Sequence, residues 1–86
     1  MIIDVSIGII FNEIGQVLLS LRNKNILSDY WEFPGGKREE NENLEGALKR
    51  ELFEEIKIKI INYFLIYTKH VNLNNIIYKL NFYRIV

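Results

Sequence analysis

Apolar and polar residues alternate along the first part of the chain. Between residues 3 and 11 the odd positions are apolar, whereas positions 4, 6 and 8 carry Asp, Ser and Gly. A period of two is typical of a β-strand with one buried face, and residues 16–22 repeat it. Because only the turn-forming residues 12–15 separate the two segments, we expect an antiparallel hairpin. Gly8 either weakens the first strand or lets a backbone or ligand approach it closely.

The middle of the chain changes to a helical period. Asn43 is the expected N-cap, and Glu45 lies in the first turn, where the helix dipole favours an acidic side chain. Gly46 costs about 1 kcal/mol relative to alanine inside a helix, which indicates either close packing or a later helix start. Phe53 lies on the second side of the helix, where we expect something to cover it. Four apolar residues at every fourth position predict the buried face of a helix that ends near residue 56: Leu44, Leu48, Leu52 and Ile56.

The remaining segments are extended or irregular. Residues 23–30 predict a loop, and residues 31–33 are expected to be extended, since a residue before proline avoids helical geometry. The Pro-Gly-Gly at residues 34–36 is either a plain tight turn or a segment whose backbone faces a ligand, and a charged loop follows at residues 37–42. The last part predicts two strands, at residues 60–69 and 76–86, joined by a turn at residues 72–75.

Glutamates gather on the predicted helix. Glu51, Glu54 and Glu55 follow the spacing i, i+3, i+4, which places three like charges within one helical turn. A solvated acidic face is the ordinary interpretation of such a run. The spacing instead puts Glu51 and Glu55 beside the leucine stripe and Glu54 at its edge, where a carboxylate needs a partner. Arg50 supplies one positive charge, and a divalent cation such as Mg²⁺ would balance the others.

The composition limits the classes of function. The 86 residues make one small domain, with 11 basic and 11 acidic side chains and no cysteine. This balance gives no indication of a nucleic-acid backbone as a partner, and the absence of cysteine excludes disulfide and zinc-thiolate scaffolds. The N-terminus lacks the pattern of a signal peptide, and the longest apolar run is too short to span a bilayer. We therefore expect a cytoplasmic protein that contacts neither membrane nor nucleic acid directly.

A long spaced pattern covers residues 36–58. Gly36 is followed after five residues by Glu42, and after seven more by Arg50, which begins the run RELFEEIKI. The pattern resembles the Nudix box, and every fixed position matches except that Lys57 stands where the family has glycine. The flanking segment WEFPGGK at residues 31–37 is similar to the MutT branch of the family, which hydrolyses oxidised guanine nucleotides such as 8-oxo-dGTP.

This resemblance implies a fold. Members of the family form an α/β/α sandwich with a mixed sheet, and the four strands and one helix predicted here agree with it in order. The similarity covers the whole chain, residues 1–86, as a single domain, but only about the first two-thirds of a usual family domain. A C-terminal helix over the second sheet face would then be missing. We expect a shortened chain that is either monomeric or a homodimer through the uncovered sheet face.

The resemblance also implies a metal site. Glu54 and Glu55 would bind Mg²⁺, or Mn²⁺ in its place, together with the carbonyl group of Gly35. Glu51 would be either a further ligand or the base that activates water.

Two further box positions have supporting roles in this interpretation. Arg50 would orient the glutamates through salt bridges, and Glu42 is a weaker metal or structural position. Lys57 would have to adopt the left-handed conformation of the glycine that it replaces, at a cost on the order of 1 kcal/mol, although its charge suits the end of the helix dipole.

The resemblance places the nucleotide beside five residues: Arg22, Glu32, Phe33, Pro34 and Gly35. Alternatively, Arg22 is a surface residue at the end of a strand, and Trp31 and Phe33 are core residues. His70 has no role in the family pattern and is expected in a loop or at a strand end.

The implied reaction follows from charge. Mg²⁺ on the glutamate face would neutralise the phosphates and lower the pKa of a bound water, and a carboxylate would remove the proton. The resemblance implies attack at the β-phosphorus of a nucleoside triphosphate, with release of nucleoside monophosphate and pyrophosphate. Such an enzyme would remove oxidised guanine nucleotides from the pool used in DNA replication and repair. Two alternatives stay open: a Nudix hydrolase of another nucleoside diphosphate derivative, and an inactive nucleotide-binding remnant.

Overall fold

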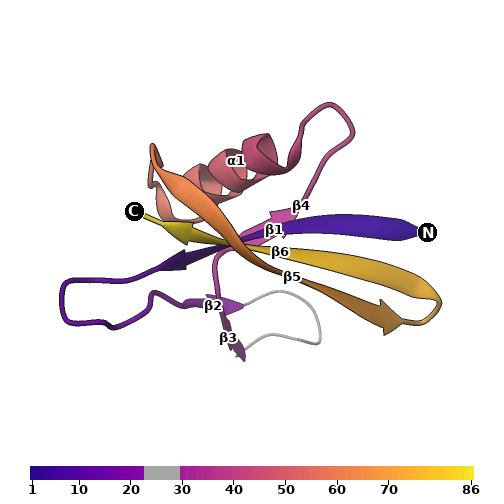
Figure 1. The fold of residues 1–86 in the computed structure, drawn as a ribbon, viewed down its shortest axis with the longest axis horizontal. Coiled ribbons are helices and arrows are strands. Elements are labelled where there is room, and N and C mark those ends of the chain that lie inside the picture. Colours follow the sequence, from indigo (N-terminus) through magenta and orange to yellow (C-terminus); the bar gives the residue numbers. More distant parts are fainter. Residues whose placement is uncertain (23–29) are drawn as a thin grey trace.

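The computed structural model describes residues 1–22 and 30–86, which contain one helix and two sheets (Figure 1). The elements are β1 (Ile2–Ile10), β2 (Ser20–Arg22), β3 (Tyr30–Glu32), β4 (Gly35–Lys37), α1 (Leu44–Ile56), β5 (Tyr63–Leu73) and β6 (Ile76–Ile85). Four strands form a mixed sheet in the order β4-β1-β6-β5, in which β1 and β6 are parallel, and β2 pairs with β3 in a separate sheet. The predicted α/β fold with a mixed sheet and one main helix is confirmed. Across the described residues, no helix is long and apolar enough to cross a membrane.

Helix α1 begins and ends where the sequence predicts. Asn43 is extended, and its Oδ1 accepts a hydrogen bond of 2.7 Å from the Gly46 N–H group, as expected of an N-cap. A Cβ atom on Gly46 would lie 3.1 Å from that same oxygen, so close packing at the cap explains the glycine. At the other end Lys57 adopts the left-handed conformation, with φ of 59°, and its N–H group donates to the Phe53 carbonyl.

The core lies between α1 and one face of the four-stranded sheet. Leu48 and Leu52 are fully buried and pack with Ile60 and Tyr83. Other apolar side chains are partly buried around them: Ile10, Leu44, Ile56, Ile58, Tyr63 and Ile85. The predicted leucine stripe is therefore confirmed as the buried face of the helix. Phe53 points away from this core and is exposed.

The helix packs on the face of β1 that carries small and polar residues. The Ser6 hydroxyl donates a hydrogen bond of 2.7 Å to the Leu44 carbonyl. A Cβ atom on Gly8 would lie 3.1 Å from a methyl group of Leu52. Small side chains on β1 therefore let α1 approach the sheet, which explains Gly8 through the close approach of a neighbouring helix. The apolar residues Val5 and Ile7 consequently line the opposite face.

The predicted hairpin forms only in part. The turn is present, since the Asn12 side chain accepts hydrogen bonds from the N–H groups of Ile14 and Gln16. Beyond it, however, the only isolated β-bridge among the described residues joins Phe11, just after β1, to Val17, and the strand predicted at residues 16–22 is reduced to β2. Strands β4 and β6 already occupy both edges of β1, so β2 pairs with β3 instead.

Strand β4 corrects the prediction at Pro-Gly-Gly. Gly35–Lys37 pairs antiparallel with residues 5–7 of β1, so the interpretation as a plain tight turn is wrong. The charged loop therefore begins one residue later than predicted. The loop predicted at residues 23–30 lies outside the described residues, except that Tyr30 begins β3.

The predicted C-terminal hairpin is present, but β5 both starts and ends later than predicted, at Tyr63 and Leu73. Strand β5 starts at Tyr63 rather than at residue 60, because Ile60 is buried in the core below the helix. The turn to β6 is narrower than expected: Asn74 and Asn75 have φ values of 51° and 64°, which fit a two-residue type I′ turn. His70 lies within β5, opposite Lys79, so its expected place in a loop or at a strand end is wrong.

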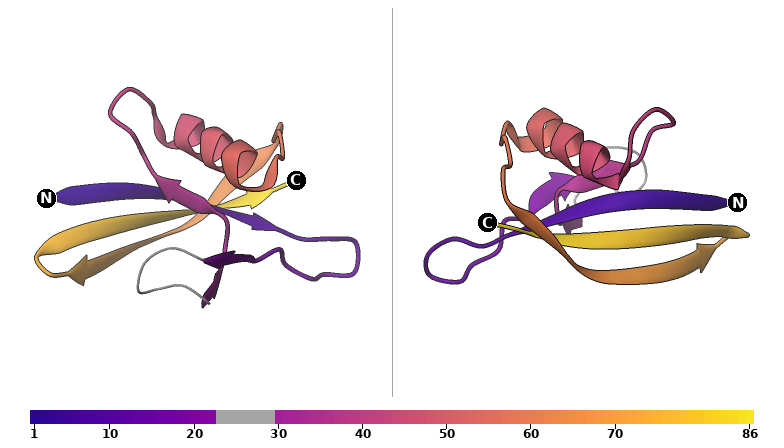
Figure 2. Two further views of the ribbon diagram at one scale, coloured as in Figure 1. Left: turned by 180° about the vertical axis from the view of Figure 1, so that it is seen from behind. Right: turned by 45° about the horizontal axis from the view of Figure 1, so that its top comes forward.

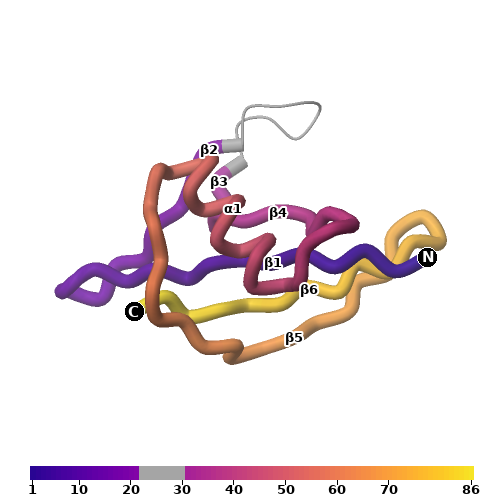
Figure 3. The backbone as a smooth tube through the Cα atoms, turned by 90° about the horizontal axis from the view of Figure 1, so that it is seen from above, coloured from indigo at the N-terminus to yellow at the C-terminus, as the bar shows by residue number. Residues whose placement is uncertain are grey.

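The layers are seen in the two further views of the ribbon (Figure 2). Helix α1 covers one face of the mixed sheet, and no described helix covers the other. From above, α1 lies over β1 and β4, and the segment that follows the helix crosses to the far edge of the sheet, where β5 begins (Figure 3). The site described below lies at the opposite edge, where β4 and the N-terminal half of the chain meet the helix.

Candidate active site

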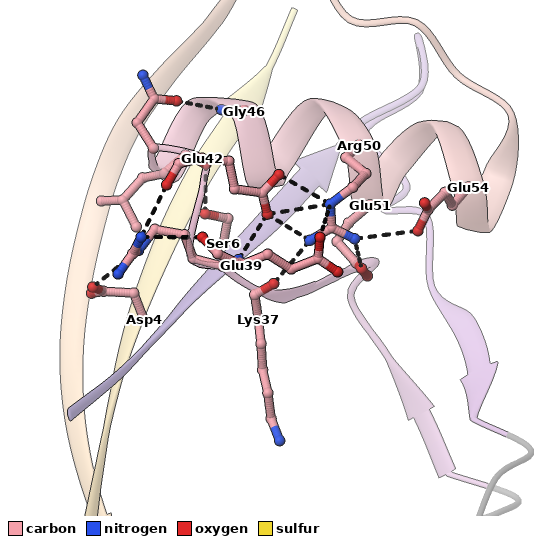
Figure 4. A network of polar contacts seen from close by, with 12 residues as sticks. Asp4, Ser6, Lys37, Glu39, Glu42, Gly46, Arg50, Glu51 and Glu54 are labelled. Atoms are coloured by element: carbon pink, nitrogen blue, oxygen red, sulfur yellow. Dashed lines mark hydrogen bonds and ion pairs between the residues drawn. The ribbon is translucent and has the colours of Figure 1, made fainter. Parts of the chain in front are cut away.

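Arg50 is the centre of the charged network on α1 (Figure 4). Its guanidinium donates to both carboxylate oxygens of Glu42, with the shortest contact at 2.7 Å. The Nη1 atom donates to Glu51 at 2.7 Å and to Glu54 at 3.3 Å, and Nη2 donates to the Lys37 carbonyl at 3.0 Å. One side chain therefore fixes carboxylates from the preceding loop and the helix against β4, which is the orienting arrangement predicted for Arg50.

Glu42 is the most strongly held carboxylate of this network. Hydrogen bonds from Arg50 and from the Glu39 backbone lower the pKa of Glu42 from 4.5 to about 2. The same contact raises the pKa of Arg50 above its already high ordinary value, so both groups stay charged. Since this carboxylate is fully engaged by Arg50, the structure favours the structural interpretation of Glu42 over the metal-binding one.

Glu51 differs from its neighbours because it is half-buried. Burial raises the pKa of Glu51, and the hydrogen bond and charge of Arg50 act in the opposite direction. The prediction that Glu51 lies on the core side of the helix is therefore confirmed. A carboxyl group with a raised pKa beside a fixed cation is a group that can accept a proton during a reaction.

Glycines in β4 make room for this carboxylate. A Cβ atom on Gly36 would overlap the carboxylate of Glu51, and one on Gly35 would overlap the Ser6 carbonyl oxygen. Gly35 also has φ of 153°, a backbone conformation that other residues rarely adopt. The Gly-Gly pair is therefore required by the close approach of β4 to both β1 and the helix.

Among the described residues, Glu55 is held by polar groups of Ser20 and Gly35 rather than by Arg50. Its Oε1 accepts a hydrogen bond of 2.7 Å from the Ser20 hydroxyl, and its Oε2 accepts one of 3.2 Å from the Gly35 N–H group. The prediction that Glu55 lies on the core side is wrong, because the side chain is exposed. Sequence reasoning did not single out Ser20, although the strand alternation puts Ser20 on the same face as Arg22.

These groups line an open depression of about 1380 Å³. One wall carries the box residues Arg50, Glu51, Glu54 and Glu55 with Gly35 and Gly36. A second wall belongs to the uncovered sheet face and is apolar: Val5, Ile7, Val71, Leu73, Tyr78 and Leu80. The depression therefore joins a cluster of carboxylates to an apolar surface, a combination that can hold a ligand with a charged end and a flat apolar end.

The structure brings together only some of the residues predicted to bind the nucleotide. Glu32, Phe33 and Gly35 line the depression. Pro34 is fully buried, and its carbonyl accepts a hydrogen bond from Gly8, so it supports β4 from behind. The side chain of Arg22 lies outside the described residues. Trp31 is 65% exposed, so its interpretation as a core residue is wrong.

The donor set suits a hard divalent cation. Glu51 and Glu54 contact the same Nη1 atom of Arg50, and Glu55 accepts a hydrogen bond from the Gly35 N–H group, so carboxylate oxygens lie at both Arg50 and β4. Oxygen donors of this kind are the ligands that Mg²⁺ takes in proteins. Within residues 1–22 and 30–86, no three acidic or histidine side chains lie together as one metal-binding group. Glu54 is exposed, so its side chain can turn toward an ion without repacking the core.

The family model of the NUDIX domain matches residues 2–76. The chain belongs to the Nudix family. The Arg50 network and the Gly35-Gly36 pair described above lie within the part of the chain that matches the Nudix model.

Two Nudix relatives have similar sequences. The 8-oxo-dGTP diphosphatase of Buchnera aphidicola subsp. Schizaphis graminum is 47% identical over 60 residues, which cover 70% of this chain and 46% of that protein. The 8-oxo-dGTP diphosphatase of Haemophilus influenzae is 50% identical over 62 residues, which cover 71% of this chain and 46% of that protein. The matched segment thus spans less than half the length of either relative.

A solved structure confirms the Nudix fold. The MutT NUDIX hydrolase from Burkholderia pseudomallei superposes with a TM-score of 0.88 at 24% identity, over 99% of this chain and 67% of that chain. The strand order and the position of the box helix are therefore those of the family.

Proposed function

We propose that this chain carries the catalytic part of a Mg²⁺-dependent Nudix hydrolase that cleaves a phosphoric anhydride bond of a nucleoside triphosphate. The observation that carries the proposal is the Arg50 network, in which one guanidinium positions Glu51 and Glu54 against the Gly-Gly strand of the Nudix box. Its arrangement supports the roles expected from the sequence, with Glu51, Glu54, Glu55 and the Gly35 carbonyl as the residues that would hold the ion.

The proposed substrate is an oxidised guanine nucleotide such as 8-oxo-dGTP, cleaved to nucleoside monophosphate and pyrophosphate. Support comes from the identity of 47% to one 8-oxo-dGTP diphosphatase and of 50% to another. The acidic and apolar walls of the depression fit the triphosphate–metal end and the base end of such a molecule. In this role the protein would remove damaged nucleotides before DNA replication and repair, in the cytoplasm.

The chain's own residues would act by positioning and by proton transfer. The bound ion would neutralise phosphate charge and activate a water molecule. Arg50 keeps Glu51 and Glu54 in place and stays charged throughout, since its pKa is raised further by Glu42. A carboxylate of this cluster would accept the proton from water, and Glu51 would do so where it does not itself bind the ion.

A substitution of Glu55 tests the proposal. Glu55→Gln should lower kcat for 8-oxo-dGTP by roughly a hundredfold or more, since it removes a charged ligand worth several kcal/mol in the transition state. Mg²⁺ binding, measured by calorimetry, should weaken in parallel. The matched control is Glu40→Gln, an exposed glutamate of the charged loop, which should leave both quantities unchanged. Activity that persists in Glu55→Gln would contradict the proposed site, and a panel of other nucleoside diphosphate derivatives would show whether the substrate class is different.

A further inference from the structure

Ser20 connects two parts of the molecule that are far apart in sequence. Its hydroxyl donates a hydrogen bond of 2.7 Å to Oε1 of Glu55, 35 positions away on α1. A hydroxyl that donates to an ionised carboxylate makes a short, charge-assisted bond, which is stronger than one between neutral groups. The contact therefore fixes the direction of the Glu55 carboxylate.

Ser20 belongs to a small arm that stands apart from the main sheet. The β2–β3 arm consists of Ser20–Arg22 and Tyr30–Glu32, and its strands pair with each other rather than with β1 (Figure 1). Leu21 and Glu32 of this arm line the same depression as the glutamates of α1. The arm is thus one wall of the candidate site, and Ser20 is a point at which that wall is bonded to the helix.

The two oxygens of Glu55 are held unequally. Oε1 has the short bond to Ser20, whereas Oε2 accepts a longer bond of 3.2 Å from the Gly35 N–H group. Oε2 is therefore the oxygen that can exchange its partner for an ion while Oε1 keeps its own. Carboxylates that bind metals are commonly oriented by a hydrogen bond to the second oxygen, and loss of that partner typically weakens metal binding.

We infer that Ser20 is a positioning residue: its hydroxyl orients Glu55 toward the metal ion and couples binding of the ion to the position of the β2–β3 arm. The inference rests on the proposed function, because it assigns a role to Ser20 in the same metal site. The coupling is reciprocal. An ion that fixes Glu55 also fixes Ser20, so metal binding orders the wall that contacts the rest of the ligand, and a ligand that draws the arm inward strengthens metal binding.

The test measures metal affinity and arm position without reference to turnover. Ser20→Ala should raise the dissociation constant for Mg²⁺ about tenfold in calorimetry, and Ser20→Thr, which keeps a hydroxyl, should restore it. Trp31 is the single tryptophan of the chain and lies in β3, so its fluorescence reports on the arm. Addition of Mg²⁺ should change this fluorescence in the original protein and in Ser20→Thr, but much less in Ser20→Ala.

Leu19→Ala is the control for a general disturbance of this region, because Leu19 directly precedes Ser20 and has no hydroxyl to bond Glu55. Its dissociation constant for Mg²⁺ should equal that of the original protein. Hydrogen exchange supplies a second measurement that needs no variant: the amides of β2 and β3 should become more protected when Mg²⁺ is added. If Ser20→Ala binds Mg²⁺ as tightly as the original protein, or if Leu19→Ala loses as much affinity, the inference is wrong while the proposed function stands. If the folded original protein binds no Mg²⁺, both are overturned.

Discussion

A single arginine offsets part of the repulsion among the glutamates of the Nudix box. Carboxylates at i, i+3 and i+4 destabilise an isolated helix, yet the structure places Glu51 and Glu54 on the same nitrogen of Arg50. Glu42 closes the network from the preceding loop. Arg50 makes more hydrogen bonds to Glu42 than to Glu51 or Glu54, so its positive charge does not fully neutralise these two carboxylates. A divalent cation would compensate the remaining negative charge.

The pH dependence of stability should report on Glu42. Its pKa is about 2 in the folded protein against 4.5 for an ordinary glutamate, so the folded state favours the ionised form. The stabilising contribution of Glu42 is then fully present above about pH 4.5 and is lost as the pH falls toward 2. Glu42→Gln should therefore be less stable than the original protein at neutral pH, and the difference should shrink toward zero between these two values.

Urea denaturation at a series of pH values measures this difference as the free energy of unfolding. Glu40→Gln is again the matched control, since Glu40 is an exposed neighbour in the same loop. A constant gap between the original protein and Glu42→Gln from neutral pH to pH 2 would contradict the role of this ion pair.

At the scale of the elements, the end of α1 carries a measurable strain. Lys57 has φ of 59°, a conformation that costs a side-chain-bearing residue on the order of 1 kcal/mol. Its Nζ atom donates to the Glu54 carbonyl at 3.2 Å, and it lies over the Phe53 ring at 5.9 Å, but both contacts are exposed and offset little of this cost.

Lys57→Gly should therefore stabilise the protein, by about 0.5–1 kcal/mol in urea denaturation, because glycine adopts this conformation without steric penalty. Lys59→Gly provides the comparison. Lys59 is absent from the positive-φ residues of the described chain, so glycine there only adds freedom to the unfolded state and should not stabilise. A loss of stability in Lys57→Gly would mean that the lysine contacts outweigh the backbone strain.

The sequence predicts elements well where the determining contacts are local. Asn43 and the leucine stripe define both ends of α1, because capping and helical periodicity act over a few residues. Strand β4 was missed because Gly35 and Gly36 carry no side chains that could alternate, and its formation depends on β1, thirty residues earlier. The parallel pairing of β1 with β6 likewise joins the two ends of the chain and leaves no local pattern.

In the candidate site, too, some contacts follow from local spacing and others depend on the folded structure. Arg50, Glu51 and Glu54 form a network within one helix, so their association follows from spacing. The contact of Ser20 with Glu55 exists only because the β2–β3 arm lies against the helix, and a serine in a strand gives no indication of that. Local spacing therefore identifies the charged end of the site, whereas the arm and the apolar wall require the folded structure.

At the scale of the whole molecule, the described residues form a core on one side of the sheet. Leu52 is fully buried between α1 and β1, whereas Leu73 is 57% exposed on the opposite face, beside the depression. The two leucines have the same chemistry and differ in their surroundings, so a matched pair of substitutions measures how unequal the two faces are.

Leu52→Ala should lower the free energy of unfolding by about 3 kcal/mol, because it leaves a cavity in the core between α1 and the sheet. Leu73→Ala should cost less than about 0.5 kcal/mol, as substitutions at exposed positions usually do. Both are measured by urea denaturation at several protein concentrations. A large loss of stability in Leu73→Ala would mean that the second face of the sheet is covered in solution. The dependence of this loss on protein concentration then shows whether a second copy of the chain covers the face. A cost that grows with protein concentration indicates a second copy on this face, since association stabilises only the state that can pair, whereas a constant cost argues against a second copy.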